Sequence, residues 1–173
     1  MKLQNVVLAA SVAIAVGLSA GAACAGTVTA TASVSVIVLA PVTLQATQGL
    51  DFGAVTKPGN AGFNTVSLDA ASSNVTVSGT GDAARAAGGA VNSARFSLIG
   101  DAGITYSTTQ SLTFAQPGLA RVSVSTPVAA NGALGVIPAG GRQELRFGGA
   151  FDLSAATPVQ SYTGALSVTV NYN

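Results

Sequence analysis

Apolar and polar residues alternate strictly through the last stretch of the chain, residues 161–173. In an extended strand this period of two places the apolar side chains on one face and the small polar ones on the other. Such a strand packs one face against a core and turns the other toward water. The pattern predicts a β-strand whose inward residues are Leu166, Val168, Val170 and Tyr172.

The same alternation occurs near the other end of the chain, in residues 26–36. Threonine and serine occupy one face of this segment, which is about 35 Å long when extended. Two interpretations remain open: a first strand of the chain's own sheet, or a strand donated to a partner. The face that would enter a core consists of Val28, Ala30, Ala32, Val34 and Val36.

Between these ends, short β-rich segments are separated by turns containing Gly, Pro and Asn. Residues 94–100 and 104–107 are expected to form a hairpin, and residues 127–141 a long loop. The spacing predicts an all-β, immunoglobulin-like sandwich of antiparallel sheets, without a helix in the mature chain. Further strands are expected at residues 42–44, 50–55, 65–68, 74–78, 112–114, 121–125 and 143–151.

The N-terminus has the pattern of a secretory signal peptide. Lys2 precedes an apolar run at residues 6–18, and Ala23-Cys24-Ala25 has the small-x-small form of a cleavage site. Lipidation at Cys24 is the alternative, although Gly21 stands where lipoprotein signals usually have leucine. The predicted organisation is a signal peptide at 1–25, an N-terminal extension at 26–36 and a β-sandwich domain at 37–173.

The charge and composition of the chain exclude some classes of function. Only 8% of the 173 residues are charged, and residues 26–173 contain six cationic and six acidic side chains. This balance leaves no basic patch of the size that nucleic-acid binding requires. The exported chain is also expected to have no membrane span after signal cleavage.

Few residues suit catalysis or cofactor binding. The chain has no histidine, and its one cysteine, Cys24, lies in the predicted signal peptide. The usual general base, thiol nucleophile and metal ligands are therefore missing. Residues 79–84 match G-x-G-x-x-A, but no helix is expected to follow, as a dinucleotide site would require. We expect no enzymatic activity, no cofactor and no metal, and we assign the scattered aspartates to turns and strand ends.

Three short motifs carry a resemblance to a known family: L-D-F-G-A-V at 50–55, R-F-G-G-A-F-D-L at 146–153 and S-Y-T-G-A-L-S-V-T-V-N-Y-N at 161–173. Together they resemble a family of exported bacterial β-domains known mainly as a domain of unknown function. The resemblance covers about residues 34–173. These domains look in turn like the pilins of chaperone–usher fimbriae and like spore-coat-U-like subunits.

The resemblance implies a sandwich that lacks its last strand. In chaperone–usher pilins, a periplasmic chaperone lends a strand until the usher exchanges it for the N-terminal extension of the next subunit. Applied to this chain, the donor face is that of residues 26–36. The acceptor groove, which binds a subunit or the chaperone, is lined by Leu166, Val168, Val170 and Tyr172.

The resulting prediction is a structural subunit of a bacterial surface filament or fimbria-like assembly, joined by donor-strand exchange. Its expected partners are other copies of itself, a periplasmic chaperone and an usher. Its expected route runs through the periplasm to the cell surface. The alternative is a monomeric secreted or cell-surface binding domain, adhesin-like, that uses the loops at 57–64 and 127–141.

Overall fold

The computed structural model describes residues 32, 33, 35, 36, 38 and 40–172. The chain divides into residues 1–37 and residues 38–173, and the ten strands found among the described residues lie in the second unit. The described residues contain no helix, and so none long and apolar enough to cross a membrane. The strands are β1 (Thr43–Gln48), β2 (Phe63–Leu68), β3 (Val75–Gly79), β4 (Ala94–Ile99), β5 (Tyr106–Phe114), β6 (Ala120–Val124), β7 (Val128–Ala129), β8 (Arg142–Phe147), β9 (Gly149–Ser154) and β10 (Gly164–Tyr172).

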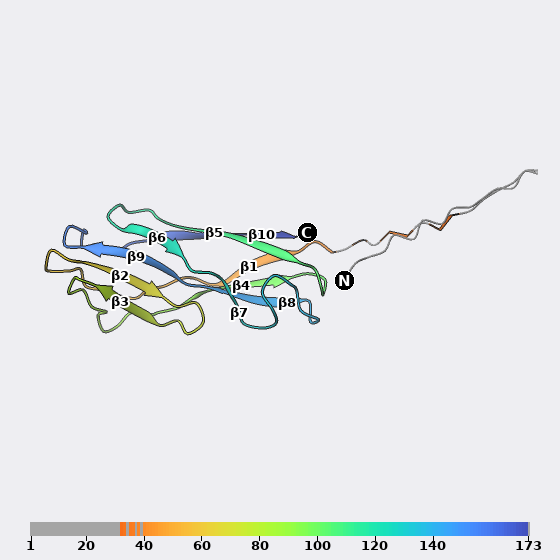
Figure 1. The fold of residues 1–173 in the computed structure, drawn as a ribbon, viewed down its shortest axis with the longest axis horizontal. Coiled ribbons are helices and arrows are strands. Elements are labelled where there is room, and N and C mark those ends of the chain that lie inside the picture. Colours follow the sequence, from red (N-terminus) through yellow and green to blue (C-terminus); the bar gives the residue numbers. More distant parts are fainter. Residues whose placement is uncertain (1–31, 34, 37, 39, 173) are drawn as a thin grey trace, which may run out of the picture. The chain divides into compact units, whose positions relative to one another are not determined.

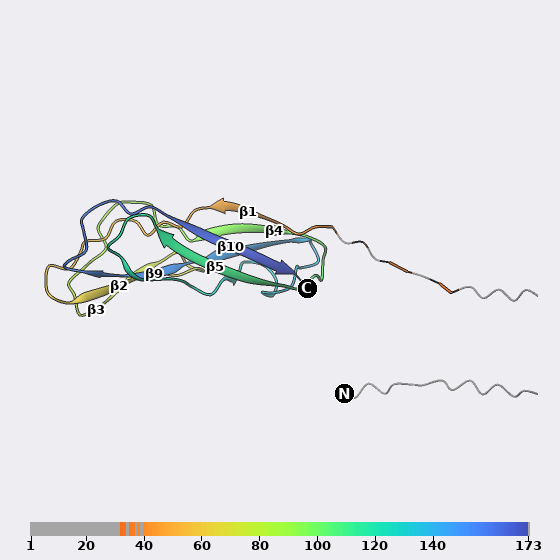
Figure 2. The same cartoon turned by 90° about the horizontal axis from the view of Figure 1, so that it is seen from above.

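These strands form three antiparallel sheets with the orders β1-β4-β8-β7, β10-β5 and β3-β2-β9-β6. The β10-β5 pair lies in a layer above β1 and β4, and it crosses them when seen from above (Figures 1 and 2). The prediction of an all-β fold is confirmed, and the layered antiparallel sheets agree with a β-sandwich.

Two apolar clusters fill the space between the layers. The first is centred on Phe96 and Leu98 of β4 and on Leu145 and Phe147 of β8, and the inward side chains of β10 pack against it. The second is centred on residues of β2 and β9, namely Val66, Leu68, Phe151 and Leu153. Both clusters use every second residue of their strands, which is how period-two patterns bury one face.

A buried polar contact fixes the long loop after β7 to the first cluster. The Tyr106 hydroxyl donates to Gln143 Oε1 at 2.5 Å, and Gln143 Nε2 donates to the carbonyls of Asn131 and Ala133 at 2.9 and 2.8 Å. Gln143 is fully buried, so these bonds satisfy a side chain that would otherwise be costly to enclose. Burial also raises the pKa of Tyr106.

The hairpin expected from residues 94–107 is wrong. β4 pairs with β1 and β8, whereas β5 pairs with β10 in another sheet. The chain leaves the first sheet after Ile99. Just before β5 it bonds to the long loop after β7 instead, and the Ile137 amide donates to the Ile104 carbonyl at 2.9 Å. The turn that follows β4, at Asp101–Gly103, joins two sheets rather than the two strands of a hairpin, which local turn chemistry does not reveal.

Several predicted segments have different bounds in the structure. Residues 50–55 form only isolated bridges at Asp51 and Val55, and residues 112–114 are the end of the nine-residue β5. The predicted loop at 127–141 contains the short β7. The segment 143–151 is two strands in different sheets, divided at Gly148.

Gly148 permits this change of sheet because the neighbouring backbone lies very close to it. A Cβ atom at Gly148 would overlap the Leu68 carbonyl oxygen and lie 2.9 Å from the Ala70 amide nitrogen. Both obstacles are backbone atoms, which cannot rotate away as a side chain can.

Gly148→Ala should therefore lower the free energy of unfolding by about 2 kcal/mol or more, measured by denaturant unfolding. Gly140→Ala is the matched control, since a Cβ there meets nothing within 4 Å. Equal stability of the two variants would contradict the close approach at Gly148.

Candidate functional site

The site begins with β10, which has a partner on one side only. Nine consecutive pairs join β10 to β5, from Gly164↔Phe114 to Tyr172↔Tyr106. Along the opposite edge of β10, no strand pairs among the residues that the structure describes. That edge lies on the side of β1, whose own outer edge is also unpaired in the described part of the chain (Figure 2).

The hydrogen bonding just before β10 shows which backbone groups face the open edge. The Ala115 amide donates to the Thr163 carbonyl at 2.8 Å, so Thr163 points its carbonyl toward β5. In an antiparallel ladder, successive residues point their N–H and C=O groups to alternate sides. Within the described part of the chain, the unpaired amides and carbonyls of this edge are therefore those of Gly164, Leu166, Val168, Val170 and Tyr172, the set that includes the core-facing side chains.

Beside the start of this edge lies a cleft of about 1340 Å³. One wall is the chain from Ala46 to Lys57, which includes the end of β1, and the other is residues 157–164 with Leu166. This volume exceeds the roughly 300–1,000 Å³ of typical small-molecule pockets. A segment of polypeptide is thus a better match in size than a metabolite.

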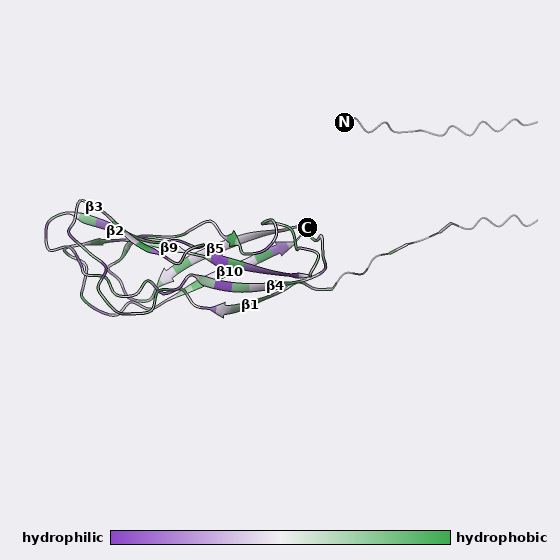
Figure 3. Ribbon diagram, turned by 90° about the horizontal axis from the view of Figure 1, so that it is seen from below, coloured by the Kyte–Doolittle hydropathy of each residue, from purple (hydrophilic) through white to green (hydrophobic). Residues whose placement is uncertain are grey.

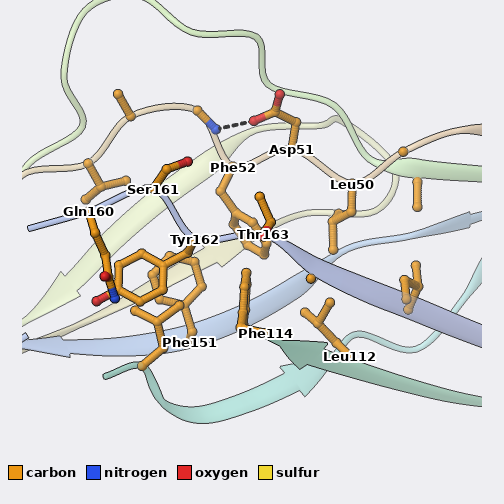
Figure 4. A pocket seen from close by; sticks show the side chains of 18 of the residues that line it. Leu50, Asp51, Phe52, Leu112, Phe114, Phe151, Gln160, Ser161, Tyr162 and Thr163 are labelled. Carbon is orange, nitrogen blue, oxygen red and sulfur yellow. Dashed lines mark hydrogen bonds between the residues drawn. The ribbon is translucent and has the colours of Figure 1, made fainter. Parts of the chain in front are cut away.

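Aromatic side chains form the interior of the cleft (Figure 4). Phe151 contacts Phe52 edge to face with ring centroids 4.9 Å apart, and Phe114 at 5.8 Å. Tyr162 extends this cluster, with its ring 6.4 Å from that of Phe114. The Tyr162 hydroxyl donates to the Pro158 carbonyl at 2.9 Å, which leaves the aromatic rings to define the apolar surface.

A tight turn directs Phe52 into this cluster. The Gly53 amide donates to Asp51 Oδ1 at 2.9 Å, and Gly53 has a φ of +73°, in the left-handed region that favours glycine. This local bend does not reverse the chain, since Asp51 bridges Asn92 and Val55 bridges Arg85 along the same neighbouring segment. The Phe52 side chain lies between the sheets, 9% exposed.

Few charged groups line the cleft. Its charged lining residues in the described structure are Asp51 and Lys57, and both are engaged: Asp51 in the turn, and Lys57 Nζ with the Ala155 carbonyl at 2.9 Å. Other aspartates also bond to backbone. Amides of Gly59 and Asn60 lower the pKa of Asp82, and the Ser72 hydroxyl and amide lower that of Asp69.

The structure brings the predicted acceptor residues together on one face. Leu166, Val168 and Val170 are half-buried against the first apolar cluster, whereas Tyr172 is 59% exposed. Of the predicted donor residues, Ala32 and Val36 are exposed and belong to no strand, with Val36 82% exposed. Val28, Ala30 and Val34 lie outside the described residues, as does the predicted signal peptide.

The aromatic lining of the cleft was not predicted from the sequence, although a signal for it was present. The three motifs quoted for the family resemblance contain Phe52, Phe151 and Tyr162. These residues are far apart in sequence and meet in one cluster through Phe114. The aromatic residues that these motifs share are the signal from which a common site could have been predicted.

The open edge should be visible in backbone hydrogen exchange. In a copy whose edge is uncovered, the amides of Leu166, Val168 and Val170 should exchange faster than those of Ala165, Ser167 and Thr169. Residue-resolved exchange by NMR measures this alternation. Uniformly slow exchange along β10 in such a copy would contradict an uncovered edge.

Comparison with known proteins places the chain in a family. No curated protein and no solved structure matches it. A family profile, the domain of unknown function DUF4402, matches residues 42–172, which is every strand of the structure. The chain therefore belongs to the DUF4402 family.

Proposed function

We propose that this protein is a non-enzymatic structural subunit of a bacterial surface filament or fimbria-like assembly, joined by donor-strand exchange. The observation that carries the proposal is the edge of β10 that no described residue pairs with, beside an open apolar cleft. A long strand edge is a template for another strand, and many proteins protect it with charge, proline or a short length. β10 has nine residues and contains neither a charged residue nor a proline.

The proposed donor is residues 26–36 of a second copy. Fully extended, these eleven residues span about 35 Å, enough to follow the nine residues of β10. The segment has no charged side chain, as suits a cleft whose two charged residues are already engaged. Its Val and Ala face would turn toward the core and enter the cleft at the Gly164 end of β10, while its Thr and Ser face remained toward water.

The direction of the donor strand decides whether a filament results. β10 ends at Tyr172 at the same end of the domain where β1 begins, so the N-terminal extension joins the domain at that end (Figure 1). A donor antiparallel to β10 would leave the cleft at the opposite end, near Gly164. Each domain would then follow the last in a heterologous contact that does not close.

An extension inserted into its own domain would instead run parallel to β10. It would enter from the β1 end, turn through residues 37–42 and fill the same cleft. That arrangement would give a monomer, so strand direction separates exchange from self-insertion.

Backbone pairing and apolar burial would provide the binding free energy. Burying five Val and Ala side chains contributes on the order of several kcal/mol before the cost of ordering the donor. Because an uncovered edge of this kind also favours aggregation, the proposal includes a periplasmic chaperone that covers it and an usher that exports the subunit.

The alternative is a monomeric, adhesin-like binding domain. One observation favours it: Phe63, predicted to lie in the binding loop at 57–64, is the first residue of β2 and is 48% exposed, and the Arg121 guanidinium lies 6.0 Å from its ring centroid. Arg121 has a φ of +46°, which is unusual for a residue other than glycine. An exposed aromatic ring beside an arginine offers a ligand both an apolar and a cationic contact.

Deleting residues 26–36 tests the proposal. The exported protein should form ordered filaments, and the deletion variant should form none; light scattering and negative-stain microscopy measure both. Adding a peptide of residues 26–36 to the full-length protein should cap growth and shorten the filaments.

Matched single substitutions control for general effects of the deletion. Val34→Asp places a charge on the face proposed to enter the cleft and should abolish assembly. Ser35→Asp adds the same charge to the opposite face and should leave assembly nearly unchanged. A folded monomer from the full chain, unfolded by the deletion, would contradict exchange and favour the monomeric alternative.

A further inference from the structure

The outer face of the β4-β8 pair gathers three arginines. Along β4 and β8 the core residues alternate with outward ones, and β4 shows this alternation of apolar and polar residues in Figure 3. Arg95 and Ser97 of β4, and Arg142, Glu144 and Arg146 of β8, lie on the face away from the core. With one glutamate among three arginines, this face has a net charge of +2, although residues 26–173 are neutral as a whole.

The central pair in this cluster consists of two like charges. Arg95 and Arg146 are direct cross-strand partners, an arrangement that is unfavourable by itself. Both share one carboxylate oxygen: Arg146 Nε lies 2.7 Å from Glu144 Oε1, and Arg95 Nη1 lies 3.8 Å from the same atom. The Glu144 carboxylate is thus shared by two guanidinium groups, and its contact with Arg95 is the longer of the two.

Much of the hydrogen-bonding capacity on this face is unused. Arg95 Nε and Ser97 Oγ are buried atoms without a hydrogen-bond partner in the described structure. Buried polar groups of this kind are rare and each raises the free energy of the fold. The Arg142 side chain is exposed and forms no ion pair within the described residues.

We propose that this face binds the carboxylate or sulfate groups of an acidic polysaccharide. A planar guanidinium forms paired hydrogen bonds with either oxyanion, and a second anion would neutralise the excess charge that Glu144 leaves. Arg142 and Arg146 lie four residues apart on one strand, about 13 Å. Two guanidinium groups at this spacing along one strand match a polymer of repeated anionic groups better than they match one small anion.

Binding of the purified protein to two polyanions tests this proposal. The probes are heparin, which is sulfated, and polygalacturonate, which is carboxylated, with dextran as the neutral polymer; biolayer interferometry at low and high salt gives the affinities. We expect binding to at least one polyanion, none to dextran, and weakening with salt. The preferred probe identifies the anionic group.

Arginine substitutions then locate the surface. Arg142→Gln and Arg146→Gln should each weaken polyanion binding about tenfold. Arg85→Gln removes the same charge from an exposed residue outside the cluster and should change the affinity by less than about twofold. Glu144→Gln should strengthen binding, because it releases both arginines; a purely structural role for these residues would not produce this gain.

Several results would overturn the proposal. These are no binding above dextran, an equal loss from Arg85→Gln, or weaker binding after Glu144→Gln in a folded protein. Circular dichroism checks folding; if Arg146→Gln unfolds, Arg142→Gln and Glu144→Gln decide the question. Light scattering of Arg142→Gln should show unchanged assembly, which separates this surface from the proposed strand exchange.

Discussion

The constraint on which the molecule depends is the one-sided pairing of its last strand. β10 is paired with β5 along its full length of nine residues, while its other edge has no partner in the described structure. The backbone groups on that edge belong to the residues whose side chains help to complete the first apolar cluster. The side chains of β10 therefore help to close the core, while its outer edge remains available to another strand. For this reason the stability of the domain and its capacity to accept a strand are coupled.

The rest of the fold positions this edge and the cleft beside it. Gly148 lets the chain pass from β8 to β9, so that one continuous segment supplies the centre of both apolar clusters. The Asp51–Gly53 turn places Phe52 against Phe151, and the chain before β10 adds Tyr162. Together these features make a cleft lined by apolar side chains whose charged groups are already bonded.

Local patterns predicted most strands but not their partners. The alternation in residues 161–173 predicted the strand and three of its four inward residues, Leu166, Val168 and Val170, because a half-buried strand needs a period of two. The fourth, Tyr172, is 59% exposed at the end of the strand. The supposed hairpin at 94–107 was wrong because a turn says nothing of the strand's final partner, and β5 pairs with β10, which is distant in sequence. The break at Gly148 was missed for a similar reason: close approach by Leu68 is a tertiary contact between residues eighty positions apart.

Cysteine cross-linking between two copies tests the central claim most directly, since residues 26–173 contain no cysteine to interfere. One copy would carry Val168→Cys, and the other a single cysteine at successive positions of the donor segment. Strand exchange predicts disulfides between copies that form from core-facing positions such as Ala30→Cys and fail from Thr29→Cys, because neighbouring residues point to opposite faces. Cross-links confined to single copies, or formed without this alternation, would contradict the account.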